Sequence, residues 1–301
     1  MAEIKAVARG LCPPLLWNLA KRIRGRYFVK PVRKIVHGVA ILFPPSHILP
    51  SIIANFPRHD TLLPEFLQFL RNERQTKLLV VDVGANVGDT AALAAAKIGA
   101  ENIRLICLEA DDQYLPFLKE NTKNIDAEII CAIIGSSSKE EHVALQRSEG
   151  GTGAIIASSQ TTTVQALDDI LMDQAPDLIK IDTDGYDIQV LRGAARCLQN
   201  IGPHLFLEYS PYHIRVHGRE EPTNMFSFLR NIGYSATIIY DNAGYPICLL
   251  DLDSRELAMI AEYVDAKPGL HADLLISKDN NLLARFYESD RNRFTEPAQG
   301  T

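Results

Sequence analysis

The 301-residue sequence contains little cysteine, and none of it is arranged for metal binding or cross-linking. Its five cysteines form no C-x-x-C pair, which is the spacing typical of zinc sites and redox motifs. Scattered cysteines also provide no disulfide framework, so we expect a reducing compartment. Cys107 and Cys131 lie inside apolar runs, and we interpret them as small core residues.

Long apolar runs are also missing. The most apolar early segment, from Ile35 to Phe56, is interrupted by histidines and prolines, and proline breaks a continuous helix. Because a transmembrane helix needs about 20 consecutive apolar residues, we predict no membrane span. The first 25 residues do not resemble a secretory signal either, since Pro13-Pro14 interrupts their apolar run. We therefore expect a cytoplasmic protein.

Positive charge is scarce outside the N-terminal segment. The formal net charge is -6, from 31 Lys and Arg against 37 Asp and Glu. Residues 1–38 hold nine of the basic residues and a single acid, Glu3, so the remainder is strongly acidic. An acidic main domain is a poor match for a phosphate backbone, and we expect no nucleic-acid substrate.

We divide the chain into a basic N-terminal extension, residues 1–60, and a main domain, residues 61–301. The extension is expected to be irregular and partly helical. Leu15 to Phe28 mixes apolar and aromatic residues with four basic ones. One interpretation is a segment that lies peripherally on the anionic inner face of the membrane. The other, slightly favoured because no single helical stripe is visible, is a helix packed on the main domain.

Beyond residue 60, apolar runs alternate with helical periodicity. Leu62 to Arg74 repeats apolar residues at helical spacing, whereas Leu78 to Val81 is the continuous run of a buried parallel strand. Further strands are predicted at 103–108, 128–134, 178–181, 205–207, 236–240 and 274–277, with a hairpin arm at 245–250, and helices at 114–121, 167–172, 188–198 and 225–230. Residues 142–165 are expected to form short strands and loops. This alternation predicts an α/β fold with a doubly wound, mostly parallel sheet.

The first strand of this pattern ends in a glycine-rich loop, Asp82-Val83-Gly84-Ala85-Asn86-Val87-Gly88, and an alanine-rich helix follows. The glycines allow a ligand to approach the backbone, and the helix offers N–H groups to a polar ligand. The spacing differs from G-x-G-x-x-G, which disfavours a nicotinamide-dependent dehydrogenase. It suits a nucleoside that carries an amino acid tail. Glu109, at the end of the next strand, is placed to accept ribose hydroxyls.

Five segments together resemble the FkbM family of methyltransferases. In chain order they read DVGANVGDT at 82–90, LEA at 108–110, TVQALDDIL at 163–171, DLIKIDTDGYDIQVLRGA at 177–194 and FLE at 206–208. The family's usual K-x-D-x-E-G segment has aspartate, Asp184, in place of its glutamate. The resemblance implies a class I methyltransferase fold, Rossmann-like and seven-stranded. It also implies S-adenosylmethionine as cofactor and O-methylation of a hydroxyl, commonly on a sugar, glycan, glycolipid or other natural product.

From the loop and the acid that follows it, we expect S-adenosylmethionine to bind seven residues. These are Asp82, Gly84, Asn86, Gly88, Glu109, Ala110 and Asp182. The Pro-Pro-Tyr-like motif of amino-methylating nucleic-acid enzymes does not follow the strand at 178–181, and the chain contains no Pro-Cys dipeptide of the kind used by cytosine-carbon enzymes. A non-catalytic relative that binds the cofactor or a glycan in a glycan-assembly complex is the alternative hypothesis.

Polar residues also follow the strands at 178–181 and 205–207, where ligands bind in doubly wound folds. An acceptor hydroxyl needs a base, and His213 has the suitable unperturbed pKa. Asp182 or Glu208 would orient the hydroxyl or take the place of His213 as the base. The alternative interpretation of His213 is a loop histidine on the protein surface. We favour a site without metal, although Asp182, Asp184 and Glu208 could instead gather a divalent cation, contact the cofactor or cap helices.

Overall fold

The computed structural model describes residues 30–45, 47–147, 153–267 and 270–295. The basic segment at 15–28, for which a membrane contact and a helix packed on the main domain were both considered, lies outside these ranges. Within the described ranges, no helix combines the length and the apolar character that spanning a bilayer requires.

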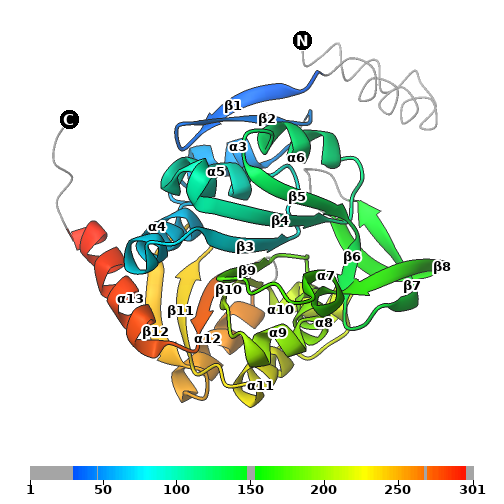
Figure 1. Cartoon of the computed structure of the whole chain (residues 1–301). Helices are drawn as coiled ribbons and strands as arrows, with labels where there is room; N and C mark the ends of the chain where they lie inside the picture. Colours follow the sequence, from blue (N-terminus) through cyan, green and yellow to red (C-terminus); the bar gives the residue numbers. More distant parts are fainter. Residues whose placement is uncertain (1–29, 46, 148–152, 268–269, 296–301) are drawn as a thin grey trace, which may run out of the picture.

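A large central sheet organises the chain (Figure 1). Its eight strands follow the order β12-β11-β13-β10-β9-β3-β4-β5. Their bounds are β3 Leu78–Val83, β4 Ile103–Glu109, β5 Asp126–Cys131, β9 Leu178–Ile181, β10 His204–Tyr209, β11 Ala236–Asp241, β12 Pro246–Asp251 and β13 Ala272–Ser277. The strands from β5 to β10 pair in parallel, and β13, β11 and β12 pair antiparallel. The predicted α/β class is confirmed, and the sheet exceeds the expected seven strands because β12 pairs with β11 at the edge.

Helices cover both faces of this sheet, as the alternation predicts. One face packs against α4 Leu62–Arg74, α5 Asp89–Ile98, α6 Leu115–Asn121 and α13 Asn280–Thr295. The other packs against α7 Leu167–Leu171, α8 Asp187–Gly193, α9 Ala195–Asn200, α11 Thr223–Asn231 and α12 Arg255–Asp265. The side chains of β3 are buried on both faces, which explains its continuous apolar run. α12 and α13 are absent from the sequence prediction.

A second, three-stranded sheet lies beside the main one (Figure 1). It consists of β6 Ile133–Gly135, β7 Lys139–Arg147 and β8 Gly153–Ala166, in the order β6-β8-β7. The expectation of short strands and loops at 142–165 is therefore wrong, because β7 and β8 pair over their length as a long arm. Their exposed positions carry polar residues, which weakens the apolar signal by which a strand is recognised.

The N-terminal extension contains a hairpin, β1 Val32–Val36 and β2 Val39–Phe43, followed by α3 Leu49–Asn55. The expectation of an irregular segment is wrong for this part. His37 and Gly38 both have positive φ, 46° and 83°, which is the turn geometry that matches the twist of a two-residue hairpin. The hairpin and α3 pack against α5 in a small apolar cluster made by Val36, Ile41, Phe43, Leu49, Val87, Ala92 and Leu93. The division at residue 60 stays a prediction.

Two short helical turns lie at the carboxyl end of β10. They are α10 Pro211–His213 and η2 Ile214–Gly218, which follow β10 directly. A further turn, η1 Ala100–Asn102, connects α5 to β4. Because β10 lies beside β9 and β9 beside β3, the segments after these strands meet at one edge of the sheet.

Candidate functional site

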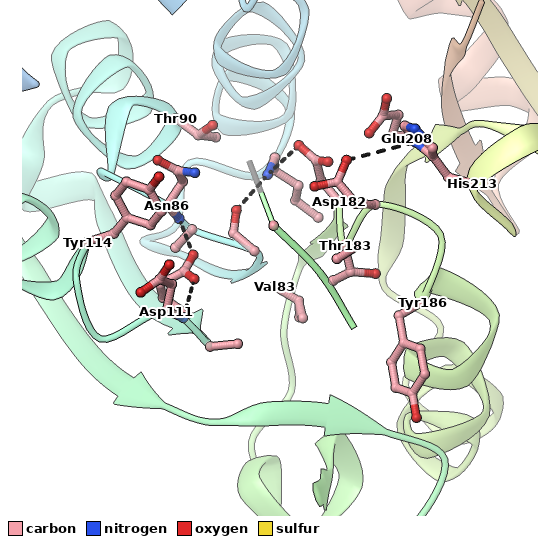
Figure 2. A pocket seen from close by; sticks show the side chains of 18 of the residues that line it. Val83, Asn86, Thr90, Asp111, Tyr114, Asp182, Thr183, Tyr186, Glu208 and His213 are labelled. Carbon is pink, nitrogen blue, oxygen red and sulfur yellow. Dashed lines mark hydrogen bonds and ion pairs between the residues drawn. The ribbon is translucent and has the colours of Figure 1, made fainter. Parts of the chain in front are cut away.

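A cavity of about 720 Å³ lies at the carboxyl ends of β3, β4, β9 and β10. Figure 2 shows Asn86, Asp111 and Tyr114 on one side, and Asp182, Glu208 and His213 on the other. The predicted residues that line it are Gly84, Asn86, Glu109, Ala110, Asp182, Asp184, Glu208 and His213. The structure thus brings residues from four strand ends into one cavity.

Gly84 allows the glycine loop to touch the end of β9. Its φ is +87°, and a Cβ atom at this position would lie 1.9 Å from the carbonyl oxygen of Asp182. No other residue fits there without displacing backbone, because both the left-handed conformation and the close approach require the absence of a side chain. The absence of a side chain at Gly84 therefore allows the loop after β3 to pack directly against Asp182 at the end of β9.

Glu109 is held by the backbone on both of its carboxylate oxygens. The Asn86 N–H donates to Oε2 and the Asp111 N–H donates to Oε1, each at 2.7 Å. Burial raises the pKa of Glu109 to about 7, although these two hydrogen bonds act in the opposite direction. Each oxygen keeps a further lone pair, so the carboxylate is fixed in orientation and still able to accept hydroxyl donors.

Asp82 and Gly88, the two other residues expected to bind the cofactor, do not line the cavity. Asp82 is buried and pairs with Lys180, whose Nζ lies 3.1 Å from Oδ1. Gly88 precedes α5, and a Cβ atom there would lie 2.7 Å from Cδ1 of Leu118. In the structure both residues lie on the side of the loop that faces away from the cavity, where Asp82 pairs with Lys180 and Gly88 packs close to Leu118.

Lys180 connects the loop to the acids of the cavity. Its Nζ lies 3.1 Å from Asp82 Oδ1 and 3.3 Å from Asp182 Oδ2, and it donates to the Gly84 carbonyl at 3.4 Å. Burial opposes its charge, but the two carboxylates outweigh burial and raise the pKa of Lys180 well above its usual value. The lysine stays protonated and offsets part of the surrounding negative charge.

Asp182 and Glu208 form a hydrogen-bonded pair of carboxyl groups. Burial and the Asp182 charge raise the pKa of Glu208 well above its usual value. Burial acts in the same direction on Asp182, but the Lys180 charge outweighs it and lowers the pKa of Asp182. Glu208 consequently holds the proton and Asp182 the charge. His271 Nδ1 lies 3.4 Å from Glu208 Oε1 and extends this group of polar side chains.

His213 lies beside Asp184 and His217. Its Nδ1 is 3.8 Å from Asp184 Oδ1 and, among the described residues, has no hydrogen-bond partner. The ring stacks on His217 with centroids 5.2 Å apart. Burial lowers the pKa of His213, and the neighbouring His217 lowers it further. His213 is therefore neutral near pH 7, which is the state that a proton acceptor requires.

The loop that carries Asp184 is held by a buried acid, Asp187. Its two oxygens accept the Thr183 N–H at 3.2 Å and the Gly185 N–H at 3.0 Å. Asp184 has a left-handed φ of 51°, and burial together with the Asp182 charge raises its pKa to about 6. The loop shape is thus fixed independently of any ligand.

The cation site considered from the sequence would need Asp182, Asp184 and Glu208 to gather around one ion. Within the described ranges, no group of three or more His, Cys, Asp or Glu side chains is arranged to hold a metal ion. Glu208 is hydrogen-bonded to Asp182, and Lys180 Nζ lies 3.3 Å from Asp182 Oδ2.

Several residues that line the cavity were missed from the sequence. They are His47, Asp60, Asp111, Tyr114, Lys180, His271 and Asp273. Lys180 lies within the segment at 177–194 that resembles the family. Asp273 pairs in register with Glu208 on the neighbouring strand, so the alternation of side chains along β13 could have indicated it. His47 and Asp60 come from the N-terminal extension, where the sequence offers no local signal.

Comparison with known proteins relates the chain to methyltransferases. A model of the methyltransferase FkbM domain matches residues 82–236. Hexuronic acid methyltransferase AglP of Haloferax volcanii is 22% identical over 144 residues, which are 46% of this chain and 58% of that protein. The chain therefore spans less than two thirds of that relative's length.

Two solved structures are similar at low identity. Methyltransferase FkbM from Methylobacillus flagellatus KT is 19% identical, with a TM-score of 0.41, over 58% of this chain and 43% of that one. The SAM-dependent methyltransferase from Agrobacterium tumefaciens is 12% identical, with a TM-score of 0.44, over 84% of this chain and 72% of that one. Because the family model covers half of the sequence and includes the glycine loop and the strand ends around the cavity, the chain belongs to the FkbM methyltransferase family.

Proposed function

We propose that the chain is an S-adenosylmethionine-dependent O-methyltransferase that acts on a hydroxyl of a sugar, glycan, glycolipid or other natural product. One observation carries the proposal: the carboxylate of Glu109 lines the same cavity as three polar side chains from the ends of β9 and β10. These three are Asp182, Glu208 and His213. Similarity to a hexuronic acid methyltransferase supports a sugar as acceptor.

The residues around the loop fit the cofactor. The cavity volume of about 720 Å³ is within the usual range for small-molecule sites. Glu109 offers both oxygens to ribose hydroxyls, and Gly84 and Asn86 present backbone to the ligand. Ile133 and Ile155, with Ala110 packed against them, give an apolar surface suited to a flat base. When bound, the cofactor supplies a methyl group already activated by a positively charged sulfur.

The chain's own residues then have to position an acceptor oxygen and remove its proton. His213 is neutral and is the proposed base. Asp182 keeps its charge and accepts a hydrogen bond from a neighbouring hydroxyl of the acceptor molecule, which orients the reacting hydroxyl toward His213. Glu208 donates to Asp182 and so holds that carboxylate in place. In this assignment the two acids orient the hydroxyl, and the histidine receives the proton.

Radiolabelled methyl transfer is the test of this function. The purified chain, S-adenosylmethionine labelled in the methyl group and a panel of glycosides and glycolipid extracts should yield a labelled product. Calorimetry should show that Glu109→Ala binds S-adenosylhomocysteine at least about tenfold more weakly than wild type, since two hydrogen bonds to a charged group are lost. Unchanged affinity would contradict the site. Cofactor binding without transfer to any acceptor would favour the non-catalytic alternative.

We also propose that the basic extension contacts an anionic membrane surface. On β1, Ile35 is 70% exposed and Val32 is 40% exposed, and Lys30 and Lys34 lie beside them in the sequence. Each basic residue near such a surface contributes about 1 kcal/mol. The full chain should sediment with phosphatidylserine vesicles in a salt-sensitive way, and a chain without residues 1–38 should sediment less. Equal sedimentation of both would contradict this role.

A further inference from the structure

The N-terminal extension is joined to the glycine loop at two points, once through Asn121 of α6 and once directly through His47. Asn121 of α6 accepts a hydrogen bond from the Leu42 N–H at 2.8 Å and donates to the carbonyls of Leu42 and Val87, at 2.9 and 2.8 Å. It thereby joins β2 to the loop. The second contact is made by His47, whose Nε2 lies 3.1 Å from Oδ1 of Asn86. Both contacts end on neighbouring residues of the loop.

The hydrogen bonds of His47 define which of its nitrogens carries the proton. The backbone N–H of Leu49 points to Nδ1 at 3.3 Å, and an N–H can only donate. Nδ1 must therefore be unprotonated, so the proton of the neutral ring is on Nε2. Burial lowers the pKa of His47 and supports this neutral form. The Nε2–H group then donates to the Asn86 amide oxygen.

The ring of His47 is also held in place by its neighbours. Its centroid is 5.1 Å from the Phe43 ring, and the Tyr114 ring meets it edge-on at 6.3 Å. Leu49 and Phe43 belong to the apolar cluster that packs the extension on α5. The donor nitrogen is therefore presented to the loop by a rigid surrounding.

Asn86 is the residue through which this contact reaches the site. Its φ of 47° lies in the left-handed region, which asparagine tolerates but does not strongly prefer. Its backbone N–H donates to Glu109 Oε2. A rotation of this turn would move that N–H away from the carboxylate. His47, from outside the residues that match the family model, is thus two hydrogen bonds away from Glu109.

We propose that His47 is a positioning residue for the cofactor: it holds the Asn86 turn in the conformation that orients Glu109 toward the ribose. This role rests on the proposed function, because it takes Glu109 as the residue that binds the ribose. It assigns to the extension a part in building the cofactor site.

Two substitutions separate the hydrogen bond from the packing. His47→Phe keeps a ring between Phe43 and Tyr114 but removes the donor to Asn86. His47→Gln removes the ring but keeps an N–H group at the reach of Nε2. Calorimetry with S-adenosylhomocysteine on the full chain should show about three- to tenfold weaker binding for His47→Phe, the worth of one hydrogen bond. His47→Gln should bind within about twofold of wild type.

The control is His142→Phe, at an exposed position of β7, which should bind as wild type does. Wild-type affinity in His47→Phe, or equal losses in His47→Phe and His47→Gln, would overturn the positioning role. If His47→Phe does not fold, nitrogen-15 NMR of the wild-type ring decides: a proton on Nε2 supports the role, and a proton on Nδ1 overturns it.

Glu109→Ala in the same series keeps this inference separate from the proposed function. Loss of binding in Glu109→Ala with normal binding in His47→Phe overturns only the role of His47. Normal binding in Glu109→Ala, or no binding by wild type, overturns the cofactor assignment and with it this role.

Discussion

The two sides of the cavity are built in different ways. On the side of β3 and β4, backbone groups hold the key side chain: two N–H groups fix Glu109, and Gly84 lies directly on the backbone of Asp182. On the side of β9 and β10, side chains hold one another through hydrogen bonds and charges, as in Asp182 and Glu208. The first side is suited to bind a ligand in one fixed orientation, whereas the second side is suited to accept and hold a proton.

The largest expected effect tests the second side. His213→Ala should lower turnover by about a hundred- to ten-thousand-fold, the usual contribution of a general base. Affinity for S-adenosylhomocysteine should be unchanged, because His213 lies on the opposite side of the cavity from Asn86 and Asp111 (Figure 2). Steady-state kinetics and calorimetry measure the two quantities.

His142→Ala is the matched control for that loss, since His142 is exposed on β7. Retained turnover in His213→Ala would remove this residue as the base and transfer that role to Asp182. A parallel loss of cofactor affinity would mean that the two sides of the cavity are not independent, and the comparison between them would fail.

A second, smaller effect tests the backbone-built side. Gly84 and Gly38 both have left-handed φ, +87° and +83°, but only Gly84 has backbone close by; a Cβ at Gly38 would meet nothing within 4 Å. Gly84→Ala should therefore lower the free energy of unfolding by about 1–3 kcal/mol more than Gly38→Ala, the usual cost of overpacking. Urea unfolding of both variants measures the difference, and equal losses would show that the close approach to Asp182 carries no cost.

Sequence reasoning reached the two sides by different routes, and the difference has a physical reason. A strand, a glycine loop and a helix are local in the chain, so Gly84, Asn86 and Glu109 could be recognised from one stretch and the strand after it. The same motif also contains Asp82 and Gly88, whose contacts are with Lys180 and Leu118 and not with the cavity.

The second side depends on tertiary contacts that no local pattern encodes. Asp182, Glu208 and His213 were predicted as a group because adjacent parallel strands end at one edge. His271 and Asp60 reach the cavity from distant segments, and only the order of the strands and the path of the extension reveal them. The opposite pKa shifts of Asp182 and Glu208 likewise depend on burial and on Lys180.

The smallest expected effect is the pH dependence of cofactor binding, and it tests whether the backbone-built side responds to protons at all. The pKa of Glu109 is raised to about 7 by burial. The ionised carboxylate accepts both ribose hydroxyls, so binding favours that form. Affinity for S-adenosylhomocysteine should be greatest above pH 7 and fall as the pH drops through about 7, by at most about tenfold per pH unit.

Glu109→Gln should remove this dependence. Its amide cannot ionise, and its NH₂ group would face either the Asn86 or the Asp111 N–H, so binding should be weaker at pH 8 and nearly constant between pH 6 and 8. Burial lowers the pKa of His47, which favours its neutral form. A pH profile of Glu109→Gln that still falls below pH 7 would place the responsible proton elsewhere. Other acids that line the cavity and titrate in this range are Asp89, whose pKa burial raises to about 7, and Asp184, whose pKa burial raises to about 6.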